Sequence, residues 1–129
     1  MQKSKFDLPT PALLVDLDRF ESNLLKMQDA ISRTAKNLRP HAKAHKCVTI
    51  ARRQKALGAV GVCVATVSEL EWMTAAGLGV LLTTPVASTV KTDRIAAAVQ
   101  TGADVCMVVD HPVQVQMIQD SAARYGYGQ

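Results

Sequence analysis

Four short segments of the chain are continuously apolar and rich in β-branched residues. They cover residues 12–17, 61–67, 80–86 and 105–109. Such runs predict β-strands, and because apolar positions do not alternate with polar ones, both faces of the sheet should be covered. This pattern favours a parallel sheet flanked by helices. A fifth, more polar strand is predicted over residues 38–43.

Between these segments, apolar residues recur at helical spacing, as Phe20, Leu24, Met27 and Ile31 do in the first case. Glycines follow three of the resulting helices, where a left-handed residue commonly ends a helix. The predicted helices cover residues 18–31, 47–57, 68–76 and 88–100, and a fifth begins near residue 110.

Polar residues at the predicted helix starts indicate caps. Asp18 and Glu21 have the spacing of a capping box before the first helix. Asp16 is expected to cap the same helix rather than to face a site. Ser68 is predicted to cap the third helix, with Glu71 reaching back to it.

The predicted order is a strand followed by a helix, repeated five times. This α/β order leaves two main architectures, the open doubly wound sheet and the (β/α)8 barrel. A dinucleotide-binding doubly wound sheet needs a glycine-rich turn after its first strand, and residues 15–19 contain no glycine. The sequence therefore favours a (β/α)8 barrel, of which about five units are present.

The composition is that of a globular domain. Of 129 residues, 48% are hydrophobic and 20% charged, and the mean hydropathy is +0.08. No apolar run approaches the roughly 20 residues that cross a bilayer, so no membrane contact is expected. The first residues lack the apolar stretch of a signal peptide, which predicts a cytoplasmic protein.

The net charge of +4 comes from basic residues spread along the chain, and only 4% of residues are aromatic. Few side chains are therefore available to stack on bases, and no nucleic acid partner is expected. Cys47, Cys63 and Cys106 are too far apart for a metal or redox pair and are predicted to be buried thiols. Trp72 and the five methionines are predicted to be packing residues.

The stretch from Leu38 to Lys46 reads Leu-Arg-Pro-His-Ala-Lys-Ala-His-Lys, in which five of nine side chains are basic or titratable. In an extended strand, His41, Lys43 and His45 would share one face. In a barrel, catalytic groups lie at the carboxyl ends of the strands. Lys43 is thereby predicted to lie at the catalytic rim.

A partly desolvated lysine near other positive charges has a lowered pKa and attacks aldehydes to form a Schiff base. Pyridoxal 5'-phosphate (PLP) is such an aldehyde. The residues alone leave three other interpretations open: a basic surface loop, an anion site made by Arg39 and Lys46, and a solvated strand end.

Residues 7–18, which read Asp-Leu-Pro-Thr-Pro-Ala-Leu-Leu-Val-Asp-Leu-Asp, together with residues 38–46, resemble the D-threonine aldolase and D-serine dehydratase family. These are fold type III PLP enzymes of the alanine racemase-like group. In the family motif Arg-Pro-His-x-Lys-x-His-Lys, the first lysine carries the cofactor, and this lysine is Lys43 rather than Lys46. His41, two residues before Lys43 on the same predicted strand face, is expected to face the same pocket, where it contacts the cofactor, tunes the amine or is only a hydrogen-bonded barrel histidine.

The resemblance implies a lyase that acts on small β-hydroxy D-amino acids, by retro-aldol cleavage or by dehydration. It implies a divalent metal on the substrate β-hydroxyl, whose ligands come from a region near the far C-terminus that this chain does not contain. It also implies a homodimer at full length. Residues 1–129 would then be the N-terminal portion of the barrel, without the second barrel half and the C-terminal β domain, and inactive alone.

Two further hypotheses remain from the sequence. One is a protein of the same superfamily that binds PLP without catalysis or acts as an amino-acid racemase. The other is an α/β module that binds an anion without a covalent bond to Lys43. Weaker candidates for the site share only a position near a predicted strand end; they are Thr66, Ser68, Thr83, Thr84, Asp110 and His111.

Overall fold

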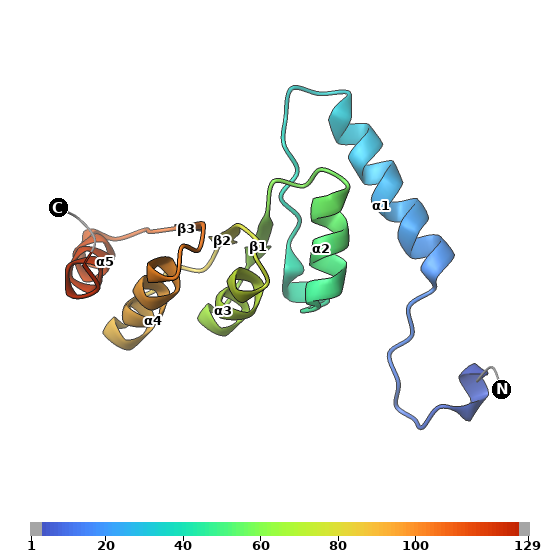
Figure 1. The fold of residues 1–129 in the computed structure, drawn as a ribbon, viewed down its shortest axis with the longest axis horizontal. Coiled ribbons are helices and arrows are strands. Elements are labelled where there is room, and N and C mark those ends of the chain that lie inside the picture. Colours follow the sequence, from blue (N-terminus) through green and yellow to red (C-terminus); the bar gives the residue numbers. More distant parts are fainter. Residues whose placement is uncertain (1–3, 127–129) are drawn as a thin grey trace.

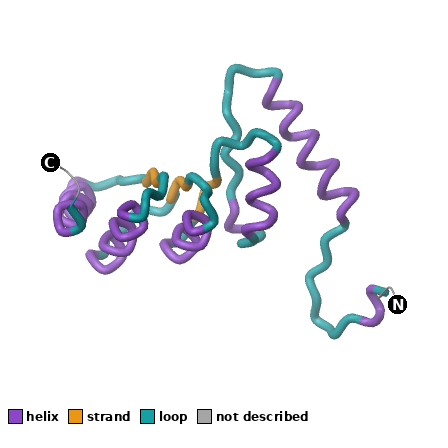
Figure 2. The backbone as a smooth tube through the Cα atoms, viewed as in Figure 1, coloured by secondary structure: helices purple, strands orange, loops and turns teal. Residues whose placement is uncertain are grey.

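Three short parallel strands, β1 (Val62–Val64), β2 (Val80–Leu82) and β3 (Val105–Met107), form a sheet in the order β1-β2-β3. The computed structural model describes residues 4–126. The helices alternate with the strands from α2 onward (Figures 1 and 2). They are α1 (Leu17–Ser32), α2 (Val48–Ala56), α3 (Val67–Ala75), α4 (Thr89–Gln100) and α5 (Pro112–Arg124), with 3₁₀ turns η1 (Lys5–Asp7) and η2 (Ala42–Ala44).

The core lies between one face of the sheet and the helices. Val62, Val64, Val80 and Leu82 are fully buried there, in contact with α3 and its neighbours. On the other face, no helix of residues 4–126 covers the strands (Figure 1). A parallel sheet with α3, α4 and α5 on one side is the geometry of an arc of a (β/α)8 barrel, whose uncovered face lines the interior. The prediction of an α/β barrel arc is confirmed in this arrangement.

The predicted strand over residues 38–43 is mostly absent. Leu38 O and Pro40 O accept hydrogen bonds from Val60 N and Cys63 N at 2.9 and 2.8 Å, and His41 forms a single parallel bridge with Cys63. Pro40 has no N–H to donate to a ladder, and the chain then enters η2. This segment therefore extends the sheet beside β1 without becoming a strand.

The predicted strand over residues 12–17 is wrong. Residues 12–16 have no regular structure, and α1 already begins at Leu17. Leu13 is 93% exposed and Val15 51% exposed. An apolar run becomes a strand only beside a partner that supplies hydrogen bonds, and no strand within residues 4–126 pairs with it.

Helix starts agree with the sequence in one case and differ in two. Asp16 caps α1 as expected, accepting from Arg19 N at 3.0 Å. Asp18 and Glu21 form no capping box, because Asp18 already lies inside α1, and the Glu21 carboxylate instead accepts from the Arg53 guanidinium of α2. The cap of α3 is Thr66 rather than Ser68, and it accepts from Glu69 N at 3.2 Å.

The packing predictions are confirmed for some residues only. Met73 is fully buried on α3, but Trp72 is 56% exposed because it lies off the face that Met73 occupies, and Met27 is also exposed. The cysteines are not all buried either: Cys47 and Cys63 are half-buried, and Cys106 on the edge strand β3 is exposed. No helix of the described residues is long and apolar enough to cross a membrane.

Leu70 tests the core directly, since its side chain on α3 is fully buried among the strands. Replacing Leu70 with Ala should lower the free energy of unfolding by about 2–5 kcal/mol, because a cavity replaces packed methyl groups. Urea denaturation followed by circular dichroism measures this change. Val90→Ala on α4, where Val90 is 72% exposed, is the control and should shift stability by less than about 0.5 kcal/mol. Equal effects would contradict the packing described.

Candidate active site

Lys43 lies in η2, directly after the segment that runs beside β1. It is exposed, and its backbone N–H donates to His41 Nδ1 at 3.3 Å. None of the ion pairs within residues 4–126 involves its ammonium. The lysine thus stands at the carboxyl edge of the sheet with no partner among the described side chains.

His41 joins this turn to the sheet. Its Nδ1 caps η2, and its Nε2 lies 3.2 Å from Thr83 Oγ1 at the end of β2. Thr83 Oγ1 in turn donates to Val64 O at 2.9 Å. His41 therefore reaches from its own segment across β1 to the next strand.

Lys46 has a different environment. It adopts a left-handed φ of 50°, and its ammonium lies 3.0 Å from Oε1 of Glu69, whose side chain is only 4% exposed. Oε2 of Glu69 accepts from Ala65 N at 2.9 Å. Burial opposes ionisation of Glu69, but these hydrogen bonds and the charge of Lys46 outweigh it and lower the pKa of the carboxyl. Lys46 is therefore held as the partner of a buried carboxylate.

His45 does not share a face with His41 and Lys43 as an extended strand would require, because η2 breaks the period of two. Its Nδ1 accepts from Cys47 N at 3.0 Å. Burial lowers the pKa of His45, which favours the neutral ring. His45 thus supports the turn into α2.

Arg39 and Lys46 are not brought together. The side chain of Arg39 packs against Gly61, just before β1. Its Nη1 lies so close that a Cβ added to Gly61 would be only 2.7 Å away. That Nη1 is buried and has no hydrogen-bond partner within the described part of the chain. Lys46 contacts residues beyond the carboxyl end of β1. The anion site that the sequence leaves open for this pair is therefore not formed.

Of the six weaker candidates near strand ends, only Thr83 contacts the motif. Thr66 and His111 cap helices, Ser68 accepts from Arg94 at 3.1 Å, and Asp110 accepts from Gln114 at 2.8 Å. Thr84 lines a rim cavity of about 370 Å³ with other residues of that edge.

Sequence reasoning missed Glu69. It lies four residues before the buried Met73 on α3, so the two share a helix face. A carboxylate on an otherwise apolar helix face needs a partner. The position of Glu69 on this face could therefore have indicated a buried ion pair from the sequence. The partner of Glu69 is Lys46, one of the two lysines of the motif. Glu69 is therefore the residue that gives Lys46 and Lys43 different environments.

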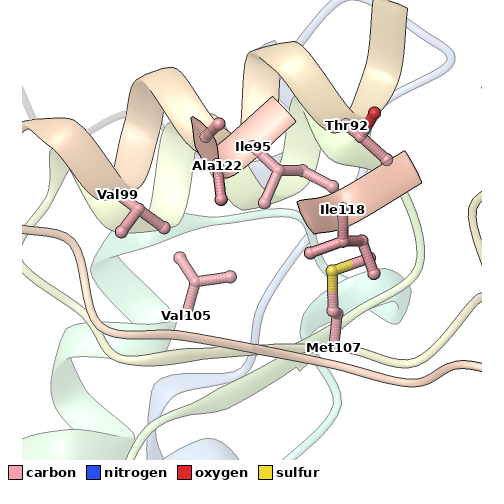
Figure 3. A pocket seen from close by; sticks show the side chains of 8 residues that line it. Thr92, Ile95, Val99, Val105, Met107, Ile118 and Ala122 are labelled. Carbon is pink, nitrogen blue, oxygen red and sulfur yellow. The ribbon is translucent and has the colours of Figure 1, made fainter. Parts of the chain in front are cut away.

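An apolar cavity of about 300 Å³ lies away from the motif, between α4, α5 and β3 (Figure 3). Ile95, Val105, Met107 and Ile118 line it, and its only polar side chain, Thr92, is already hydrogen-bonded by Ser121 at 2.8 Å. A charged cofactor would find no counter-charge there.

The residues around the motif fit one feature of PLP, its aldehyde. Lys43 offers a primary amine without an ion-pair partner, whereas Lys46 is engaged by Glu69. For a metal, residues 4–126 contain no group of three or more His, Cys, Asp or Glu side chains placed to hold one. The described site can therefore anchor an aldehyde, and it presents no metal centre of its own.

The Lys46–Glu69 pair predicts a pH dependence of stability. Because the pKa of Glu69 is lowered on folding, its contribution is present above the ordinary carboxyl value of 4.5 and is lost as pH falls below it. Glu69→Gln should cost about 1–3 kcal/mol at pH 7 and flatten the pH profile between about pH 6 and 3. Urea midpoints across this range measure both effects, with the exposed Asp18→Asn as the control. An unchanged profile in Glu69→Gln would refute the pairing.

Residues 15–129 match the family model described as alanine racemase, N-terminal domain. The chain is 37% identical over 122 residues to the 3-hydroxy-D-aspartate aldolase of Paracoccus denitrificans, covering 93% of this chain and 32% of that protein. It is 36% identical to the D-threo-3-hydroxyaspartate dehydratase of Delftia sp., covering 92% and 31%.

Among solved structures, the D-threonine aldolase of Filomicrobium marinum superposes with a TM-score of 0.89 at 43% identity, over 94% of this chain and 33% of that one. The chain thus spans about a third of the length of these relatives. With a family model that covers almost its whole length, the chain belongs to the alanine racemase N-terminal domain family.

Proposed function

We propose that the chain is the N-terminal part of a PLP-dependent lyase that acts on β-hydroxy D-amino acids, with Lys43 as the covalent anchor for the cofactor. The observation that carries the proposal is the contrast between the two lysines of the motif. The ammonium of Lys46 is paired with a buried carboxylate, and that of Lys43 is not paired within the described residues.

The relatives support the substrate class. The names of the three proteins compared above specify an aldolase for 3-hydroxy-D-aspartate, a dehydratase for D-threo-3-hydroxyaspartate and an aldolase for D-threonine. All three substrates carry a hydroxyl on the β-carbon of a D-amino acid. A divalent metal that binds this hydroxyl belongs to the proposal, with ligands supplied from outside residues 4–126.

Each residue of the turn has a task in this proposal. Lys43 presents its amine at the carboxyl rim of a parallel sheet, where a barrel gathers its catalytic groups. His41 holds the backbone of Lys43 through Nδ1, and the Lys46–Glu69 pair fixes the other end of the turn. When bound, PLP supplies an acceptor for the electrons released at the substrate Cα.

Covalent labelling tests the anchor. Incubation of the chain with PLP, reduction with borohydride and peptide mass spectrometry should place a pyridoxyl group on Lys43. Lys43→Ala should lose the label, because no other amine has the same position. Lys91→Ala is the matched control, since Lys91 is an exposed lysine in the first turn of α4, and it should label as the unaltered chain does. A label on Lys46, or equally on all lysines, would refute the assignment.

A chimera tests the activity. In the Filomicrobium marinum D-threonine aldolase, this chain would replace the matching third. We expect PLP- and metal-dependent release of glycine from D-threonine, and a loss of at least about 10³-fold with Lys43→Ala, as for removal of a covalent catalytic group. A chimera that binds PLP on Lys43 without turning over any β-hydroxy D-amino acid would instead support a non-catalytic PLP protein. Keto acid and ammonia in place of glycine would indicate dehydration.

A further inference from the structure

A chain of three hydrogen bonds links the backbone of Lys43 to the backbone of β1. Lys43 N lies 3.3 Å from His41 Nδ1, His41 Nε2 lies 3.2 Å from Thr83 Oγ1, and Thr83 Oγ1 lies 2.9 Å from Val64 O. Both ends of this chain are peptide groups. Which atom donates in each of the three hydrogen bonds follows from the two ends, because a peptide N–H can only donate and a peptide carbonyl can only accept.

A peptide N–H only donates, so Nδ1 of His41 must be an unprotonated acceptor for Lys43. A neutral imidazole with a free Nδ1 carries its hydrogen on Nε2, and this Nε2–H donates to Thr83 Oγ1. A carbonyl oxygen only accepts, so the Thr83 hydroxyl donates its hydrogen to Val64 O. The three bonds are consistent with a single tautomer of His41.

Thr83 is well placed to impose this tautomer, because the sheet holds it firmly. Its peptide N–H also donates to Val64 O at 2.9 Å. Backbone and hydroxyl of Thr83 therefore converge on one carbonyl of β1 and leave the lone pairs of Oγ1 directed to His41. Its neighbour Thr84, in contrast, has no hydrogen bond among the described residues and is exposed.

We infer that Thr83 is a positioning residue for the cofactor lysine: it accepts the Nε2–H of His41 and so stabilises the tautomer whose Nδ1 accepts from Lys43 N, and His41 then holds the turn that presents Lys43. This inference rests on the proposed function of Lys43 as the anchor. Without the Thr83 hydroxyl, the Nε2–H of His41 would lack an acceptor in a half-buried site, and only the bond from Lys43 N would still favour this tautomer.

Nitrogen NMR of the imidazole rings tests the tautomer in the intact chain. We expect ¹⁵N shifts of a protonated Nε2 and an unprotonated Nδ1 for His41 near pH 7.5. Thr83→Ser should keep this signature, and Thr83→Val should move both shifts measurably towards the values of a ring that exchanges between its tautomers. His45 and His111 are internal controls, because their Nδ1 atoms accept from other residues. A protonated Nδ1 in the unaltered chain overturns the inference, even where Thr83→Val fails to fold.

PLP labelling of Lys43 tests the consequence. Thr83→Val should slow labelling by about threefold to tenfold, the effect of one lost hydrogen bond, whereas Thr83→Ser and the control Thr84→Val should label at the unaltered rate. Equal rates for Thr83→Val and the unaltered chain overturn the positioning role. A chain with the expected His41 shifts that never labels at Lys43 overturns the proposed function instead and leaves the tautomer assignment standing.

Discussion

The buried carboxylate of Glu69 is the constraint on which the arrangement around Lys43 depends. A charged group that is only 4% exposed must have partners to be tolerated, and it finds them in Ala65 N of the loop after β1 and in the ammonium of Lys46. Because the buried carboxylate of Glu69 binds Lys46, the end of the basic motif is held beside the loop that follows β1. Because Lys46 is engaged in this pair, Lys43 is the motif lysine whose amine has no ion-pair partner among the described side chains.

The one-sided packing of the sheet gives that amine its place. Because the core lies between the strands and helices α3, α4 and α5, the opposite face of the sheet is left uncovered, and the strand ends form the rim where a barrel gathers its catalytic groups. His41 crosses β1 along this rim to reach Thr83. Parallel strands bring such residues together because all their carboxyl ends meet at one edge, although 42 positions separate the two in the sequence.

Apolar runs identified β1, β2 and β3 and helical spacing identified the helices between them, because their burial is satisfied within the described chain. Residues 12–17 and 38–43 show where such patterns fail. The first run has no strand to pair with, and the second contains Pro40, which cannot donate to a ladder. Period-two reasoning consequently put Lys43 at the correct edge but gave the wrong local conformation. The contacts of Glu69 and Thr83 depend on the packing of separate βα units, which one-dimensional periodicity does not encode.

The turn from His41 to Lys46 is held at both ends in this chain, and on our proposal these contacts anchor the cofactor lysine whichever reaction the whole protein catalyses. The relatives that share this part of the chain are named as aldolases and as a dehydratase. Both reactions need a lysine held at a fixed point, and on our proposal the His41–Thr83 contact and the Lys46–Glu69 pair supply that requirement. Neither contact discriminates between cleavage of the Cα–Cβ bond and loss of the β-hydroxyl. The groups that orient the substrate above the cofactor must make that choice, so reaction type can diverge while the anchoring turn stays the same.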